Sequence, residues 1–178
     1  MCGILGILST DSSNDIDTLV SNALSTLHHR GPDDSGVWCN LSKEVALGHT
    51  RLSILDLTSA GHQPMSSISG RYQIVFNGEI YNHLDLRNKL EKNGDSLSWA
   101  GHSDTETILR CIDCWGIEKT LNQLVGMFAI AVWNIKTKKL YLIRDRFGEK
   151  PLYYGWSNGI FLFGSELKAL RSYKGFNN

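Results

Sequence analysis

The order of strand-like and helix-like segments is the feature that most limits how this chain can fold. Short apolar runs rich in branched residues predict strands at residues 3–8, 45–52 and 72–76. The last third of the chain predicts strands at residues 128–133, 140–143, 152–156 and 160–163, and Asn158-Gly159 between the last two is a strong hairpin signal. Because strands and helices come in blocks rather than in strict alternation, the sequence predicts a layered α+β fold and not a doubly wound one.

Helices are predicted where apolar residues follow the spacing of one helical face. Residues 16–27 and residues around 84–91 show this spacing, and a short final helix is expected at residues 166–171. Another helix has a clear start, because Ser103 is followed three residues later by Glu106, which is the pattern of a capping box.

Composition excludes several classes of protein. The 178 residues suit a single domain, which we expect to span residues 1–178, and the 18 basic and 18 acidic residues cancel. A balanced charge does not favour an electrostatic nucleic-acid binder. No apolar stretch approaches the roughly 20 residues that cross a bilayer. Aspartates at positions 11, 15 and 17 also interrupt any secretory signal, so we expect no membrane association and a cytoplasmic location.

The cysteines and histidines do not form a metal-binding pattern. The four cysteines are too few for a small secreted disulfide scaffold and are expected to be free thiols. Cys111 and Cys114 form a lone CxxC without the second pair that a zinc site needs, so we expect both to pack as small hydrophobes. The six histidines are scattered without metal-ligand spacing. No metal site is therefore predicted.

Cys2 is the strongest candidate for chemistry, although a lone cysteine is weak evidence of catalysis. It follows the initiator Met1, and it is small enough for Met1 removal to be expected. The residue would then carry both a thiol and a free α-amine. The thiolate is the nucleophile, and an α-amine titrates near 7.7 to 8.0, so one residue would supply both a nucleophile and a base.

A series of motifs in fixed order extends over nearly the whole chain. They are MCGILGI (1–7), HRGPDDSG (29–36), GHTRLSILDL (48–57), GHQPM (61–65), FNGEIYNH (76–83), SDTE (103–106), GMFAIAVW (126–133), RDRFGEKPLYY (144–154) and FGSELKAL (163–170). This set resembles the class II glutamine amidotransferases, which use an N-terminal nucleophile. RGPDDSG followed by TRLSILDL is most similar to the asparagine synthetase group within them.

The resemblance implies a fold and a reaction. The expected fold is the αββα four-layer sandwich of N-terminal-nucleophile hydrolases, with mostly antiparallel sheets. The expected reaction is the hydrolysis of L-glutamine to L-glutamate and ammonia through a thioester on Cys2. No role follows for the RDRFGEKPLYY stretch, because we find no physical account of it from the sequence.

The resemblance also implies a set of site residues. Arg51 would clamp the glutamine α-carboxylate, for which a planar guanidinium is suited. Asn77 and Gly78 would form the oxyanion hole, and Glu79 and Asp104 would hold the α-ammonium. The remaining expected substrate contacts are the residues that follow Arg51, namely Leu52, Ser53, Ile54 and Leu55.

Each of these residues has a plainer interpretation when it is taken alone. Arg51 could be a surface cation after a strand, and Asn77-Gly78 could be an ordinary turn. Asp104 directly follows the Ser103 cap, where a carboxylate favours the helix dipole. We rank Asp104 above Glu79 as a direct ligand.

The loop that binds ATP phosphate in the family's synthetase half is absent from this sequence. We therefore expect no cofactor here, and ATP and magnesium only in a synthetase domain or subunit that acts as partner. The ammonia acceptor, which could be aspartate or a sugar or peptide carboxylate, stays open, as does a homo-oligomer. The alternative function is a non-catalytic glutamine sensor or docking module for a synthetase partner.

Overall fold

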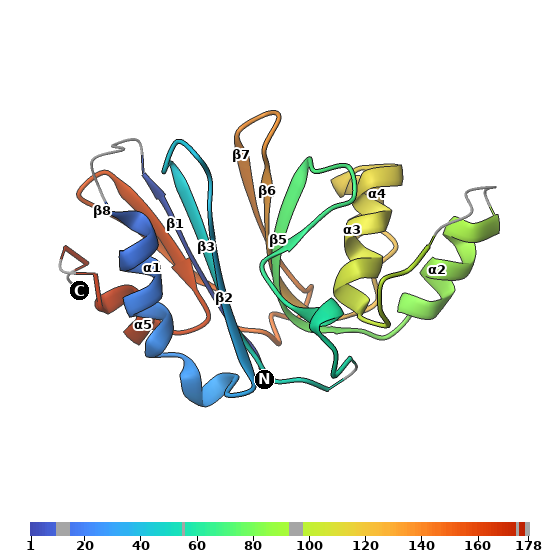
Figure 1. The fold of residues 1–178 in the computed structure, drawn as a ribbon, viewed down its shortest axis with the longest axis horizontal. Helices are drawn as coiled ribbons and strands as arrows, with labels where there is room; N and C mark the ends of the chain where they lie inside the picture. Colours follow the sequence, from blue (N-terminus) through green and yellow to red (C-terminus); the bar gives the residue numbers. More distant parts are fainter. Residues whose placement is uncertain (10–14, 55, 93–97, 174, 177–178) are drawn as a thin grey trace.

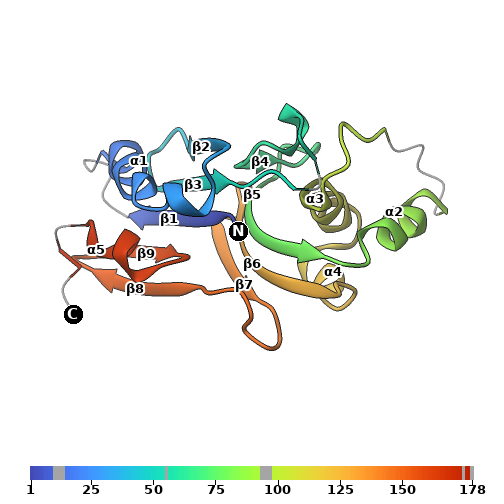
Figure 2. The same cartoon turned by 90° about the horizontal axis from the view of Figure 1, so that it is seen from below.

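The computed structural model describes residues 1–178 except residues 10–14, 55, 93–97, 174 and 177–178. Two β-sheets stack face to face, and helices cover the outer face of each sheet (Figure 1). The view from below shows the same layers and places the N-terminus between the two sheets (Figure 2).

Both sheets are antiparallel. The first has the strand order β2-β3-β1-β9-β8 and the second has the order β4-β5-β6-β7. The strands are β1 (Gly3–Ser9), β2 (Asp34–Cys39), β3 (Val45–Arg51), β4 (Met65–Ser66), β5 (Tyr72–Ile80), β6 (Gly126–Asn134), β7 (Lys139–Arg144), β8 (Tyr153–Ser157) and β9 (Ile160–Gly164).

The helices pack on the outer faces of the two sheets. On the first sheet lie α1 (Ile16–Ser25) and α5 (Leu167–Arg171). On the second lies α3 (Asp104–Trp115), with α2 (His83–Lys92) and α4 (Ile117–Leu121) against it. Two short 3₁₀ helices, η1 (His28–Arg30) and η2 (Ser59–Gly61), lie in the connections.

The side chains of the inner strands alternate between two cores, because successive residues of a strand point to opposite faces. On β1, Ile4 points into the core between the sheets, whereas Leu5 and Ile7 point towards α1 and α5. On β6, Ala129 and Ala131 belong to the core between the sheets, and their neighbours pack towards α3. Burial on both faces explains why these strands are continuous apolar runs in the sequence.

The strands and helices predicted from the sequence are present, with corrections at particular ends. The strand predicted at residues 72–76 continues to Ile80, so Asn77 and Gly78 lie in β5, and an ordinary turn there is wrong. The first helix ends at Ser25 rather than at residue 27. The strands β2 and β4 and the helix α4 were not predicted, and β2 lacked a clear signal because its sequence, DSGVWC, is not an apolar run.

The predicted start of α3 is confirmed for one half of the capping box. The Glu106 N–H donates to the Ser103 Oγ over 3.2 Å. The Glu106 carboxylate does not return to Ser103, and instead accepts the N–H groups of Ala100 and Gly101. The same pair of residues therefore caps the helix and also fixes the loop before it.

No helix in the part of the chain that the structure describes combines the length and the apolar character needed to cross a membrane.

The hairpin between β8 and β9 provides a test of the fold. Asn158 and Gly159 have φ values of 50° and 76°, which is the geometry of a tight two-residue turn. Gly159→Val should lower the free energy of unfolding by about 1 to 2 kcal/mol, because a branched side chain disfavours positive φ. The measurement is urea denaturation followed by fluorescence.

Asn158→Gly is the matched control, because glycine adopts the same φ freely. It should leave the midpoint nearly unchanged. Equal midpoints for the two variants would contradict this account of the turn.

Candidate active site

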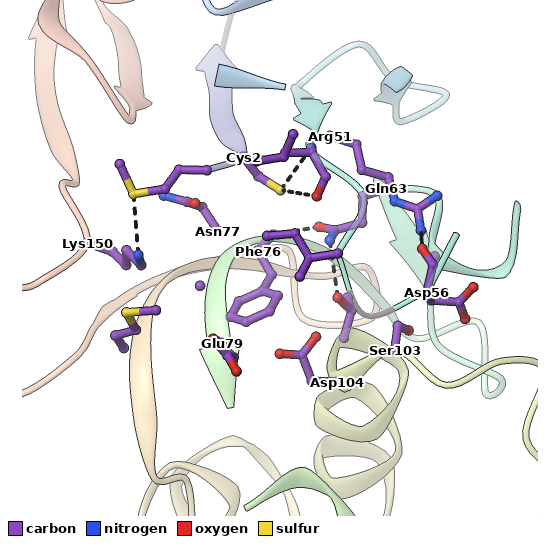
Figure 3. A pocket seen from close by; sticks show the side chains of 17 residues that line it. Cys2, Arg51, Asp56, Gln63, Phe76, Asn77, Glu79, Ser103, Asp104 and Lys150 are labelled. Atoms are coloured by element: carbon purple, nitrogen blue, oxygen red, sulfur yellow. Dashed lines mark hydrogen bonds between the residues drawn. The ribbon is translucent and has the colours of Figure 1, made fainter. Parts of the chain in front are cut away.

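A cavity of about 140 Å³ opens beside the N-terminus, at the end of the sandwich where β1, β3 and β5 meet α3 (Figure 3). Its lining combines a thiol, cations, carboxylates and amides. The lining residues are Met1, Cys2, Arg51, Leu52, Ile54, Asp56, Gly61, Gln63, Phe76, Asn77, Gly78, Glu79, Ser103, Asp104, Thr105, Met127 and Lys150.

Strand pairing sets the position of Cys2. Gly3 pairs with Thr50, so the residue before Gly3 lies beside the residues that follow β3. The Leu52 N–H donates to the Cys2 Sγ over 3.4 Å. The Arg30 Nε donates to the Cys2 carbonyl oxygen over 2.9 Å, which holds the backbone of Cys2 in place.

Arg30 is itself held by an ion pair. Its Nη1 lies 2.9 Å from the Glu166 Oε1, and His29 lies 3.0 Å from the same oxygen. Although burial acts to raise it, the hydrogen bonds from Arg30, His29 and Lys168 lower the pKa of Glu166 to about 2. The carboxylate therefore stays charged and keeps Arg30 directed towards Cys2.

The environment keeps Cys2 mainly in its thiol form. Burial raises the pKa of the Cys2 thiol above its ordinary value, and the Asp104 carboxylate adds to this effect. The Leu52 N–H, the positive N-terminus and Arg51 act in the opposite direction without cancelling it. A nucleophile in this position needs a nearby base to remove its proton.

The Arg51 guanidinium lies buried at the cavity wall, so the interpretation as a surface cation is wrong. It donates to the carbonyl oxygens of Thr58 and Asp56. A Cβ atom on Gly61 would clash with its Nη2, so any larger residue there would have to displace the guanidinium from its present position. The backbone thus holds the cation without neutralising it.

Asp56 was missed in the sequence, and it organises the loop that holds Arg51. Its carboxylate accepts hydrogen bonds from the Thr58 side chain and from the N–H groups of Thr58 and His102. These bonds lower the pKa of Asp56 to about 2. An aspartate followed two residues later by threonine is a local turn signal that could have indicated this role.

One edge of β5 presents its N–H groups to the cavity. The Phe76 N–H donates to the Gln63 Oε1 over 2.7 Å, and the Ile80 N–H donates to the Asp104 Oδ2 over 3.0 Å. Alternate N–H groups of a strand point to the same side, so the Gly78 N–H points to this edge as well. A Cβ atom on Gly78 would clash with the backbone of β6, so the strand can take only glycine there.

The Asn77 side chain is buried at the cavity with an unused donor. Its exposure is 1%, and its Nδ2 has no hydrogen-bond partner within the described residues. Unpaired buried donors are rare and costly in native proteins. The amide is therefore available to a ligand oxygen in the cavity.

His49 connects the two sheets immediately behind Asn77. Its Nε2 lies 3.2 Å from the Phe76 carbonyl oxygen, and burial lowers the pKa of the ring to about 4. The imidazole is therefore neutral, and its Nε2–H donates to that carbonyl. This contact fixes the peptide group from which the Asn77 side chain extends, so the role of His49 is structural.

The two acidic candidates differ in their surroundings. Asp104 is buried at the start of α3, and burial together with the Glu79 charge raises its pKa to about 6, against the N–H groups that favour its ionised form. Glu79 is exposed at the rim of the cavity. Because burial makes an unpaired Asp104 charge costly, a cation in the cavity would favour its ionised form.

The residues after Arg51 are only partly in the cavity. Leu52 and Ile54 line it, whereas Ser53 does not line it and donates its N–H to the Asp33 carboxylate over 2.8 Å. Leu55 lies outside the described residues.

The stretch without a predicted role, RDRFGEKPLYY, is a loop that brings Lys150 to the cavity. The Asp145 carboxylate accepts the N–H groups of Phe128, Phe147, Glu149 and Lys150. The Arg144 Nε donates to the Lys150 carbonyl oxygen over 2.7 Å. The Lys150 Nζ lies 3.4 Å from the Met1 Sδ (Figure 3).

Within the described residues, no group of three or more His, Cys, Asp or Glu side chains could hold a metal ion. Cys111 is buried in the core beneath α3, as expected. Cys114 is exposed, so the expectation that it also packs as a small hydrophobe is wrong.

Known proteins resemble this chain along its whole length. Residues 1–178 match the model of a family described as a glutamine amidotransferase domain. The glutamine-hydrolyzing asparagine synthetase 3 of Bacillus subtilis is 39% identical over 173 residues, which are 96% of this chain and 27% of that protein. A putative glutamine-hydrolyzing asparagine synthetase of Mycobacterium bovis is 38% identical over 183 residues, which cover 96% of this chain and 28% of that protein. The chain thus spans less than a third of these relatives.

A solved structure shares the fold. The glutamine phosphoribosylpyrophosphate amidotransferase from B. subtilis superimposes with a TM-score of 0.79 at 22% identity, over 96% of this chain and 43% of that chain. Together with the stacked sheets and their outer helices, this likeness confirms the αββα sandwich expected from the sequence.

The buried carboxyl of Asp104 should make folding stability depend on pH. Its pKa is about 6 in the folded chain and 3.8 as the ordinary value, so the folded state binds more protons between these values. Stability contributed by this group therefore falls as pH rises from about 4 to about 6 and stays low above that. Asp104→Asn should remove this decline, which is on the order of 2 to 3 kcal/mol.

The measurement is urea denaturation of both proteins from pH 4 to pH 8, compared as the difference between them at each pH. A difference that stays constant over this range would contradict the raised pKa of Asp104.

Proposed function

The chain belongs to the glutamine amidotransferase family, and from this premise we propose that it hydrolyses L-glutamine to L-glutamate and ammonia through a thioester on Cys2. The observation that carries the proposal is the unused Asn77 amide donor in the same cavity as the half-buried Cys2 thiol. Acyl transfer from an amide needs a nucleophile together with a donor for the oxyanion, and the cavity holds both.

Charged groups at the cavity support an amino acid as substrate. The Arg51 guanidinium suits the α-carboxylate, and the Asp104 carboxylate suits the α-ammonium. The Asp104 charge, which burial disfavours, would gain a partner when the substrate binds. Glu79 at the rim and the Gly78 N–H add a second acceptor and a second donor. Leu52 and Ile54 line the cavity, and the Ser53 N–H between them donates to the Asp33 carboxylate, which holds this part of the loop.

The first half of the reaction makes the thioester. After Met1 is removed, the Cys2 α-amine accepts the thiol proton, and the sulfur attacks the side-chain carbonyl carbon of glutamine. The carbonyl oxygen becomes an oxyanion that accepts hydrogen bonds from the Asn77 amide and the Gly78 N–H. The α-ammonium then gives its proton to the amide nitrogen, the C–N bond breaks, and ammonia leaves.

The second half restores the enzyme. The α-amine accepts a proton from water, and the water oxygen attacks the thioester carbonyl carbon. The C–S bond breaks, the proton returns to the sulfur, and glutamate leaves. Nucleophile, base and oxyanion donors are all protein groups, so we propose that this step needs no cofactor.

We further propose that the ammonia serves an ATP-dependent synthetase domain or subunit. The similarity to glutamine-hydrolyzing asparagine synthetases supports this partner, and ATP and magnesium would bind there rather than here. A free thiol nucleophile requires a reducing compartment, which favours the cytoplasm.

Substitution of Cys2 tests the reaction directly. Cys2→Ala should lower ammonia release from glutamine on the order of 10³-fold or more, because no other group at this position can form the acyl intermediate. Cys2→Ser should also lose most activity, because a hydroxyl is a far weaker nucleophile than a thiol. The assay is ammonia release by protein whose Met1 removal has been verified by intact mass.

Equal turnover by the wild type and both variants would refute a Cys2 nucleophile. Glutamine binding without ammonia release by protein that retains Met1 would favour the glutamine sensor instead, because Met1 lies in the cavity and blocks the α-amine of Cys2.

Asn77 tests the oxyanion hole separately. Asn77→Ala should lower kcat by about 10² to 10³-fold with little change in KM, because its amide would act mainly on the oxyanion. Steady-state kinetics with glutamine provide the measurement. Asn122→Ala, at an exposed position after α4, is the control and should keep full activity. A fall in kcat of less than threefold for Asn77→Ala would count against the assignment.

A further inference from the structure

Lys150 is a buried cation that the proposed reaction has not used. Its exposure is 7%, yet it forms no ion pair with a carboxylate in the described part of the chain. Of the two acids in the same loop, Asp145 uses its oxygens on four backbone N–H groups instead, and Glu149 is exposed. A buried charge without a partner is costly, and such groups cluster at functional sites.

The loop directs this cation to the N-terminus. Arg144 and Asp145 hold the backbone of Lys150 from both sides, and the Lys150 Nζ lies 3.4 Å from the Met1 Sδ. Cys2 and Lys150 line the same cavity, and Lys150 lies on the side of Cys2 that carries Asn77, away from Asp104 (Figure 3). Removal of Met1 would take away the thioether and leave the ammonium facing the new N-terminus.

We propose that Lys150 is a positioning residue for the mature N-terminus, where its ammonium keeps the Cys2 α-amine uncharged and thus able to accept the thiol proton. This inference rests on the proposed Cys2 chemistry. The physical reason is repulsion, because a second positive charge beside an amine disfavours its protonated form. Because the loop already holds Lys150 in place, no further side-chain entropy is lost to bring its charge beside the amine.

Other charges around the N-terminus act on the same amine. Arg51 from β3 adds to the repulsion, whereas Asp104 from α3 and Glu79 from β5 would favour the protonated amine. Asp56 lines the cavity beside Arg51, and Arg30 contacts the Cys2 carbonyl oxygen while paired with Glu166. The ammonium of bound glutamine would pair with Asp104 and compensate its charge. Lys150, on the side of Cys2 that carries Asn77, is then the cation that controls whether the Cys2 α-amine is protonated.

The test compares Lys150→Met, Lys150→Arg and an exposed control, Lys136→Met, in the full chain after verified Met1 removal. The readout is the pH dependence of kcat/KM for glutamine from pH 5 to pH 10. Lys150→Met should move the acid limb upward by about one pH unit, so activity falls about tenfold near pH 6 and recovers near pH 9. Lys150→Arg and Lys136→Met should keep the wild-type limb.

An unshifted acid limb in Lys150→Met, or an equal loss at every pH, would overturn the inference. If Lys150→Met does not fold, as judged by circular dichroism, Lys150→Gln takes its place under the same criteria.

A second readout needs no turnover. The midpoint pH of the NMR titration of the Cys2 α-carbon in ¹³C-cysteine-labelled protein should rise in the same variant, and an unchanged midpoint would also overturn the inference. If the wild type does not release ammonia through Cys2, the proposed function is refuted. If the wild type does so but the Lys150 variants show no shift, only the Lys150 inference is refuted.

Discussion

The site depends on the register of β1 in the middle of the first sheet. β1 pairs with β3 on one side and β9 on the other, and both of its faces are buried. A shift of one residue would turn Ile4 out of the core between the sheets towards the helices. It would also turn the residues that now face the helices into the core between the sheets. The core therefore fixes the register, and the register places Cys2 next to Leu52 and Arg51. The packing of the core therefore determines where the Cys2 thiol lies.

The rest of the cavity is built mainly from backbone groups and their fixed partners. Arg51 is held by carbonyl oxygens, and the open edge of β5 is held by Gln63 and Asp104. Donors and acceptors that are already placed need no reorganisation when charge develops during a reaction. Two cavity groups are left to respond to a substrate or to the mature N-terminus. The Asn77 amide nitrogen has no hydrogen-bond partner within the described residues, and the Lys150 ammonium contacts the Met1 sulfur but pairs with no carboxylate there.

Much of the fold could be predicted from local patterns, and the failures have physical causes. Apolar runs identified the buried strands, and the Ser103 cap and the Asn158-Gly159 turn were found because each depends on neighbours in sequence. The strand β2 and the far half of β5 were missed because pairing with β3 and β6, and not composition, keeps them extended.

The site was predicted through the resemblance in its motifs more than through its chemistry. Cys2, Arg51, Asn77, Gly78 and Asp104 do come together around one cavity. Gln63 and Lys150 were missed because their contacts join segments far apart in sequence: Gln63 and Thr105 are 42 positions apart, and Lys150 reaches Met1. Asp56 was missed although its turn with Thr58 is local. Ser53 does not line the cavity, and its N–H donates to the Asp33 carboxylate, so its expected contact with the substrate stays a prediction.

The most direct test of the central claim is to trap the intermediate. Met1-processed protein turning over ¹³C-labelled glutamine is quenched with acid, and its peptides are mapped by mass spectrometry. The account predicts one labelled glutamyl group on the N-terminal peptide, attached to Cys2. A label on another residue, or ammonia release with no label on Cys2, would contradict it.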